Sequence, residues 1–166
     1  MKPVTVEDML AARDRRVERQ RDFLARYQAP LIYLTLNIPG PDKLPRNAEA
    51  GFALACSQVE EALREKGWPL LGRWSETAKT GCEACWAVDG PAKTVKKAMT
   101  DLEEATPFGR LLDLDVLDLS GEKLARAIPR QCLLCRRPAQ VCARSRAHSV
   151  EELLERVEVI LEEALP

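Results

Sequence analysis

The sequence predicts an α+β fold, and three observations support this class. A chain of 166 residues with 46% hydrophobic residues can bury one core, so we expect a single domain over residues 1–166. Segments with a helical period alternate with short apolar runs that end in turn residues. The first and last segments, residues 5–27 and 149–165, are both expected to be helices, and they flank a mixed region.

Four strands and two helices are expected within residues 29–120. The strands are predicted at residues 30–38, 69–78, 82–89 and 110–121, and the helices at residues 47–67 and 91–105. Asn47 and Gly67 suit the two ends of the first helix, and Pro91 suits the start of the second. The order strand, helix, strand, strand, helix, strand is that of a ferredoxin-like βαββαβ core with added N- and C-terminal helices. Its first and fourth strands are antiparallel neighbours.

Residues 121–148 differ from the rest because they show no sustained period, so we expect a loop there. The final helix, by contrast, opens with a capping box of Ser149 and Glu152. Cys56 lies on the apolar face of the helix predicted at residues 47–67 and is interpreted as a core residue. Cys82 and Cys85 are interpreted as packing residues, since residues three apart in a strand point to opposite faces and cannot share one ion.

The overall charge of −1 gives no general attraction to nucleic acid or membranes. No stretch approaches the roughly 20 apolar residues of a membrane span, and the N-terminus lacks the apolar centre of a signal peptide. We therefore expect a cytoplasmic protein, in which the six cysteines serve as thiols, metal ligands or core residues.

Two carboxylates in the fourth strand form the first candidate site. Asp113 and Asp115 project from one face of a strand and repel each other unless a cation neutralises them. Mg²⁺ commonly binds such carboxylates together with substrate phosphates, which suggests phosphoryl or nucleotidyl transfer. The alternative is a strand whose solvent face carries two aspartates by chance.

The turn after the first strand is the second candidate. Gly40 allows a ligand to approach the backbone, and Lys43 offers a charge to phosphate, although the same residues suit an ordinary turn. Because the first and fourth strands are expected to pair, the segment from Asn37 to Lys43 should lie beside Asp113.

The loop combines basic residues with a Cys/His set. Residues 129–148 hold five arginines and no acid, which favours polyanion binding over a merely solvated surface. Cys132, Cys135, Cys142 and His148 have a spacing close to that of small structural zinc sites. Two interpretations stay open: Zn²⁺ binding, or small buried cysteines with His148 as a helix-terminal or phosphate-binding group.

Three segments carry a family resemblance: LTLNIPGPDK at 34–43, GRLLDLDVLD at 109–118 and RQCLLCRRPAQVCARSRAHSVEEL at 130–153. With them the chain resembles the apo-citrate lyase phosphoribosyl-dephospho-CoA transferases, the holo-acyl-carrier-protein synthases of citrate lyase. The resemblance implies a nucleotidyltransferase-type reaction. A triphosphoribosyl-dephospho-CoA precursor is transferred to a serine of the citrate lyase acyl carrier (gamma) subunit, and diphosphate is released.

On this basis Asp113 and Asp115 are expected to hold Mg²⁺, and Asp118 or a metal-bound water is expected to assist deprotonation of the serine. The residues expected to bind substrate are Asn37, Gly40, Lys43, Arg130, Arg144, Arg146 and His148.

Two rival functions remain at this stage. One is a zinc-knuckle-like module that binds RNA or a protein. The absence of Phe, Tyr and Trp from residues 109–148 counts against RNA, because recognition of single strands uses aromatic platforms. The other is a nucleotidyltransferase with a different acceptor.

Overall fold

A computed structural model describes residues 3–166. Its elements in chain order are α1 (Val6–Tyr27), β1 (Leu31–Leu36), α2 (Ala48–Lys66), β2 (Leu70–Ala78), β3 (Gly81–Val88), α3 (Ala92–Ala105), the 3₁₀ helix η1 (Phe108–Leu111), β4 (Leu112–Leu117), α4 (Ala139–Ser145) and α5 (Val150–Ala164). The strands form one antiparallel sheet in the order β2-β3-β1-β4. The predicted α+β class is confirmed.

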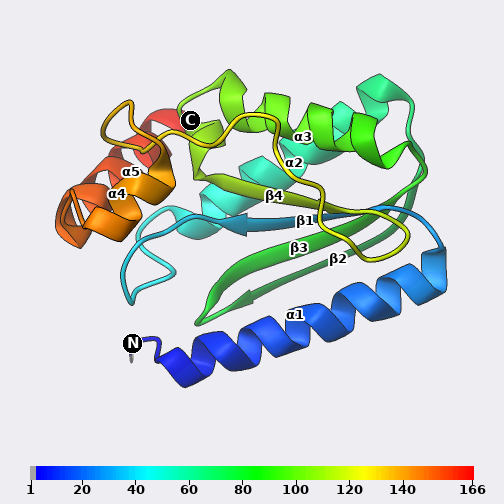
Figure 1. The fold of residues 1–166 in the computed structure, drawn as a ribbon, viewed down its shortest axis with the longest axis horizontal. Helices are drawn as coiled ribbons and strands as arrows, with labels where there is room; N and C mark the ends of the chain where they lie inside the picture. The colour runs from blue at the N-terminus through cyan, green and yellow to red at the C-terminus, as the bar shows by residue number, and fades with distance from the viewer. Residues whose placement is uncertain (1–2) are drawn as a thin grey trace.

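The sheet lies between helices on both faces. Figure 1 shows α2 and α3 over one face and α1 across the other, with α4 and α5 beside one end of the sheet. The larger apolar core joins the α2 and α3 side, where Ile32, Trp86 and Leu114 are fully buried. A smaller cluster under α1 includes Tyr33 and Cys85. This arrangement leaves β4 as an edge strand, so one of its long sides has no strand partner.

Local sequence signals explain most element boundaries. The predicted capping box at Ser149 and Glu152 is present, with the Glu152 N–H donating to Ser149 Oγ over 3.1 Å. Gly67 ends α2 at φ +68°, as expected of a glycine C-cap. Asn47 also precedes α2 as predicted, but its side chain makes no capping hydrogen bond because its own backbone adopts the left-handed conformation.

The register of β4 against β1 confirms the expected pairing. Thr35 lies opposite Asp113 and Leu36 opposite Leu112, and the Asn37 N–H donates to Leu111 O over 2.7 Å. The three apolar residues of β4 that alternate with the aspartates are fully buried. The prediction that Asp113 and Asp115 share the opposite face is therefore correct.

The cysteines of the sheet and of α2 behave as predicted. Cys56 and Cys82 are buried in the larger core, and Cys85 is buried in the smaller cluster on the other face. These three cysteines are packing residues.

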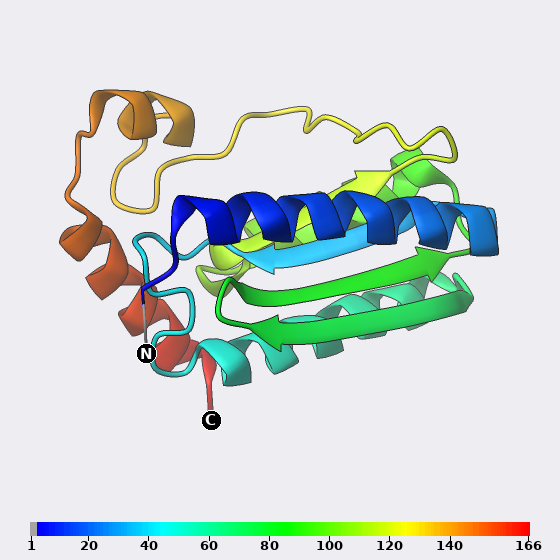
Figure 2. The same cartoon turned by 90° about the horizontal axis from the view of Figure 1, so that it is seen from below.

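The prediction of an unstructured loop at residues 121–148 is partly wrong. Residues 118–138, here called the strap, run back along the outer edge of β4 toward its start (Figure 2), but α4 follows them. That helix has seven residues, too few for a helical period to stand out in the sequence. None of the helices in residues 3–166 is long and apolar enough to cross a bilayer.

Candidate functional site

The carboxylate pair of β4 is held by cations from the strap. Asp115 Oδ2 lies 2.9 Å from Lys123 Nζ, and Asp113 Oδ1 lies 4.0 Å from Arg130 Nη1. The Asp113 side chain is 48% exposed, whereas that of Asp115 is 21% exposed. Partial burial, followed by repulsion from the Asp115 carboxylate, raises the pKa of Asp113 above its usual range. The pair thus carries negative charge that attracts cations.

Asp118, the expected helper in serine deprotonation, does not lie with this pair. It follows the opposite end of β4, roughly 16 Å along the strand from Asp113 at about 3.3 Å per residue. Its carboxylate accepts hydrogen bonds from Ser120 N, Ser120 Oγ and Glu122 N, and the Ser120 hydroxyl contact is the main reason that the pKa of Asp118 is lowered. Asp118 therefore shapes a turn, and this prediction is corrected.

The residues of the turn after β1 lie in two different environments. Asn37 lies beside the start of β4 as predicted. Lys43 Nζ instead donates to Ile38 O over 2.7 Å, and burial lowers the pKa of Lys43. Gly40, at φ +81°, packs against α5, since a Cβ there would lie 3.0 Å from Val150 Cγ1. Gly40 and Lys43 thus stabilise the turn and do not face the main cavity.

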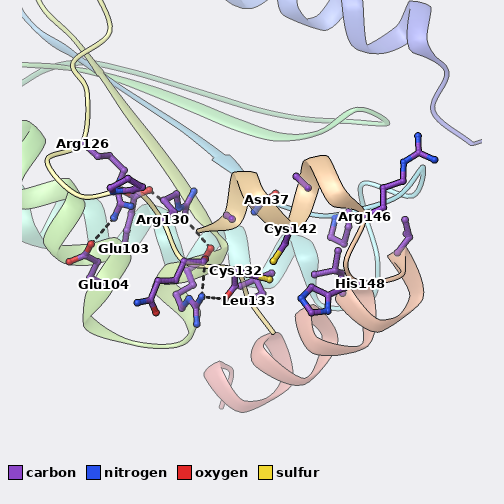
Figure 3. A pocket seen from close by; sticks show the side chains of 18 of the residues that line it. Asn37, Glu103, Glu104, Arg126, Arg130, Cys132, Leu133, Cys142, Arg146 and His148 are labelled. Carbon is purple, nitrogen blue, oxygen red and sulfur yellow. Dashed lines mark hydrogen bonds and ion pairs between the residues drawn. The ribbon is translucent and has the colours of Figure 1, made fainter. Parts of the chain in front are cut away.

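The main cavity has a volume of about 1020 Å³ and is lined by the turn after β1, the end of α3, η1, the strap, α4 and the start of α5. Figure 3 shows Glu103, Glu104, Arg126 and Arg130 toward one end, with Asn37, Cys142, Arg146 and His148 toward the other. Predicted site residues that line it are Asn37, Arg130, Cys132, Cys142, Arg146 and His148. Predicted residues outside its lining are Gly40, Lys43, Asp113, Asp115, Asp118, Cys135 and Arg144.

The structure adds charged cavity residues that the sequence did not reveal. Glu103 is 3% exposed, and its carboxylate lies 3.6 Å from both Arg126 Nε and Arg130 Nη2. Its Oε2 also accepts the free N–H of Leu114, while Lys96 Nζ donates to Leu114 O over 3.0 Å. Burial raises the pKa of Glu103. These α3 side chains satisfy the unpaired edge of β4 and link it to the cavity.

A sequence signal for these residues existed. Lys96 and Glu103 lie three residues before and four residues after Met99, the centre of the apolar face of α3. A charged residue in such a position must find a buried partner. The spacing therefore indicates that Lys96 and Glu103 are buried, although it does not identify their partners.

Two arginines tie the strap to the start of β4. Arg130 Nη2 donates to Arg110 O over 2.9 Å and to Leu112 O over 2.6 Å. In return, Arg110 Nη2 donates to Gln131 O over 2.9 Å and to Cys132 O. Arg110 was not predicted. Arg130, predicted to bind phosphate, uses its Nη2 for this anchoring and keeps its Nη1 near Asp113.

The Cys/His set converges as its spacing indicated. One ligand atom from each of Cys132, Cys135, Cys142 and His148 lies within 4.8 Å of every other. The Cys135 and Cys142 sulfurs are 3.4 Å apart, and all three cysteines are free thiols. Hydrogen bonding from His148, then from the Arg137 backbone, lowers the pKa of Cys135 to about 6. A soft sulfur and imidazole set of this kind suits Zn²⁺.

Fold and site together define an α+β domain with an arginine-lined cavity beside an acidic sheet edge. The chain belongs to the apo-citrate lyase phosphoribosyl-dephospho-CoA transferase family, whose model matches residues 4–164. The family predicted from the sequence is therefore confirmed, and with it the class of transferase.

Curated relatives cover nearly the whole chain. A probable apo-citrate lyase phosphoribosyl-dephospho-CoA transferase of Vibrio cholerae serotype O1 is 38% identical over 160 residues, which span 93% of this chain and 90% of the relative. The apo-citrate lyase phosphoribosyl-dephospho-CoA transferase of Escherichia coli O157:H7 is 35% identical over 162 residues, which span 95% and 88%. The similarity thus includes β4, the strap and both helices after it.

Proposed function

We propose that this chain attaches the prosthetic group of citrate lyase. The serine Oγ of the acyl carrier subunit attacks the innermost phosphorus of the triphosphoribosyl-dephospho-CoA donor. A phosphodiester bond forms, the bond to the next phosphate breaks, the serine proton is lost and diphosphate leaves. Family membership supports the substrates. The observation that carries the mechanism is the junction between the carboxylate pair and the arginine-lined cavity.

Arg130 marks that junction. It lines the cavity, and its Nη1 lies 4.0 Å from Asp113 Oδ1. A donor whose dephospho-CoA part fills the cavity would then place its phosphates next to β4. A volume of about 1020 Å³ is at the upper end for small-molecule sites, as a donor of this size requires. Arg146 and Arg126 supply positive charge at the two ends of the cavity.

Asp113 and Asp115 would hold Mg²⁺ in this proposal. Their partly exposed oxygens lie on one face of the strand, and cationic side chains approach both carboxylates. When bound, the ion would neutralise charge on the phosphates during an in-line displacement. Asp118 is left out because it lies at the other end of β4. In place of Asp118, we propose that Asp113, the more exposed of the pair, accepts the serine proton.

The core itself is proposed to be a ferredoxin-like variant. The βαββαβ order from β1 to β4 and the antiparallel order β2-β3-β1-β4 support this assignment.

The experiment is to incubate the protein with apo carrier subunit, the donor and Mg²⁺, and to weigh the carrier by mass spectrometry. We expect the carrier to gain the mass of the prosthetic group, and diphosphate to appear in equal amount. An unchanged carrier would contradict the proposal. Modification of a different acceptor protein would favour the rival nucleotidyltransferase, and RNA binding without any transfer would favour the zinc-knuckle module.

A further inference from the structure

The proposed transfer does not use the Cys/His set. We propose that Cys132, Cys135, Cys142 and His148 bind one Zn²⁺ as a closed structural site that forms part of the cavity wall. This inference rests on the geometry of the four residues and does not depend on the proposed substrates.

The separations fit tetrahedral zinc. Zinc–sulfur bonds of about 2.3 Å in a tetrahedron place sulfurs about 3.8 Å apart. The four ligand atoms all lie within 4.8 Å of one another, and the Cys135 and Cys142 sulfurs are 3.4 Å apart. Shifts of about 1 Å or less complete the coordination. Four protein ligands leave no open position for water, so the site is structural.

Local backbone geometry already orients the sulfurs. The Leu134 N–H points to Cys132 Sγ over 3.5 Å. A hairpin holds the first two cysteines, since Cys132 N donates to Arg137 O over 2.8 Å. His148 Nε2 is buried and finds no hydrogen-bond partner among residues 3–166. Buried polar atoms usually have a partner, and a zinc ion would supply one for this nitrogen.

Burial gives the strongest argument for a metal. Between residues 118 and 150, the buried residues are Cys132 and Cys142, two of the proposed ligands. Within α4, Cys142 is the one buried side chain. A helix of seven residues without an apolar face is not stable by itself. A metal that joins the hairpin, α4 and the start of α5 supplies the missing stabilisation.

A zinc site also gives a role to two arginines of the basic loop. Three thiolates and one Zn²⁺ carry a net charge of −1, and Arg137, in the hairpin that holds Cys132 and Cys135, can balance it. Cys132, Cys142 and His148 line the cavity, and Arg146 lies between the last two in sequence. The metal would therefore fix the backbone that presents Arg146 to the cavity.

The test is the metal content of the full chain, purified without metal-affinity steps, with Cys135→Ala beside the control Cys82→Ala. Cys82 is a buried cysteine outside the set. Elemental analysis should find one zinc per chain in the wild type and in Cys82→Ala, and a large loss in Cys135→Ala. Trypsin should cleave after Arg136 or Arg144 much faster in Cys135→Ala than in the control.

Three results would overturn the inference. The first is wild-type protein that stays free of zinc after incubation with the ion. The second is full zinc content in Cys135→Ala. The third is a disulfide between Cys135 and Cys142 in protein kept under reducing conditions, seen as a loss of two hydrogens in mass. The wild-type measurement decides the matter even if Cys135→Ala does not fold.

Discussion

The edge strand β4 and the strap beside it are neighbours built by different means. In β4, apolar side chains alternate with aspartates, and the buried side fixes the register against β1. The strap has almost no buried apolar side chains, and charged contacts such as Lys123 to Asp115 and Arg126 to Glu103 hold it. Hydrophobic burial therefore positions the candidate reacting groups, whereas electrostatics positions the cavity wall. The two regions should respond differently to substitution.

The largest effect on stability is expected in β4. Leu114→Ala removes a fully buried side chain from the main core and should lower the free energy of unfolding by about 2–5 kcal/mol. Leu119→Ala, at an exposed position where the strap begins, should change it by less than about 0.5 kcal/mol. Urea denaturation of both variants measures the difference. Equal losses would mean that burial does not distinguish the two regions.

A smaller effect is expected where the two regions meet. Glu103→Gln keeps an acceptor for the Leu114 N–H but leaves Arg126 and Arg130 without their buried counter-charge. We expect a loss of about 1–3 kcal/mol in the free energy of unfolding.

The matched control for this variant is Glu104→Gln. Glu104 pairs with Arg126 at the surface, so its loss should cost less than about 1 kcal/mol. Both values come from the same denaturation experiment. If Glu104→Gln proved as damaging as Glu103→Gln, the buried charge cluster would not be what anchors the strap.

The smallest effect on stability is expected at Asp113, and there the substitution should stabilise the protein instead of destabilising it. Burial and repulsion from Asp115 raise the pKa of Asp113, so the folded state binds its proton more tightly than the unfolded state does. Asp113 therefore lowers stability as the pH rises from the usual aspartate range through the raised value. Asp113→Asn should stabilise the protein at neutral pH, by at most about 1 kcal/mol because solvent screens this half-exposed group. Thermal unfolding at pH 7 and near pH 3 tests this, and a benefit that is larger in acid would contradict it.

The sequence predicted the residues in and beside β4 better than the charged contacts that hold the strap. Alternation in β4 predicted which face carries Asp113, and the predicted strand order brought Asn37 next to β4. Asp118 was misplaced because two further strand residues, Val116 and Leu117, separate Asp115 from the end of β4, and Asp118 lies beyond it. The role of Glu103 was missed because acidic residues of an amphipathic helix usually face solvent, and its partner Arg126 is 23 positions away in the sequence.

In this account, residues of β4 take part in the chemical step, and residues of the cavity wall bind the donor. Steady-state attachment kinetics with varied donor test this directly on Asp113→Asn and Arg146→Ala, with Asp101→Asn and Arg64→Ala as exposed controls. We predict that Asp113→Asn lowers kcat by roughly 100-fold with little change in the donor KM. Arg146→Ala should raise the donor KM by about 10-fold with kcat nearly unchanged. Wild-type kcat in Asp113→Asn, or a loss confined to kcat in Arg146→Ala, would contradict the account.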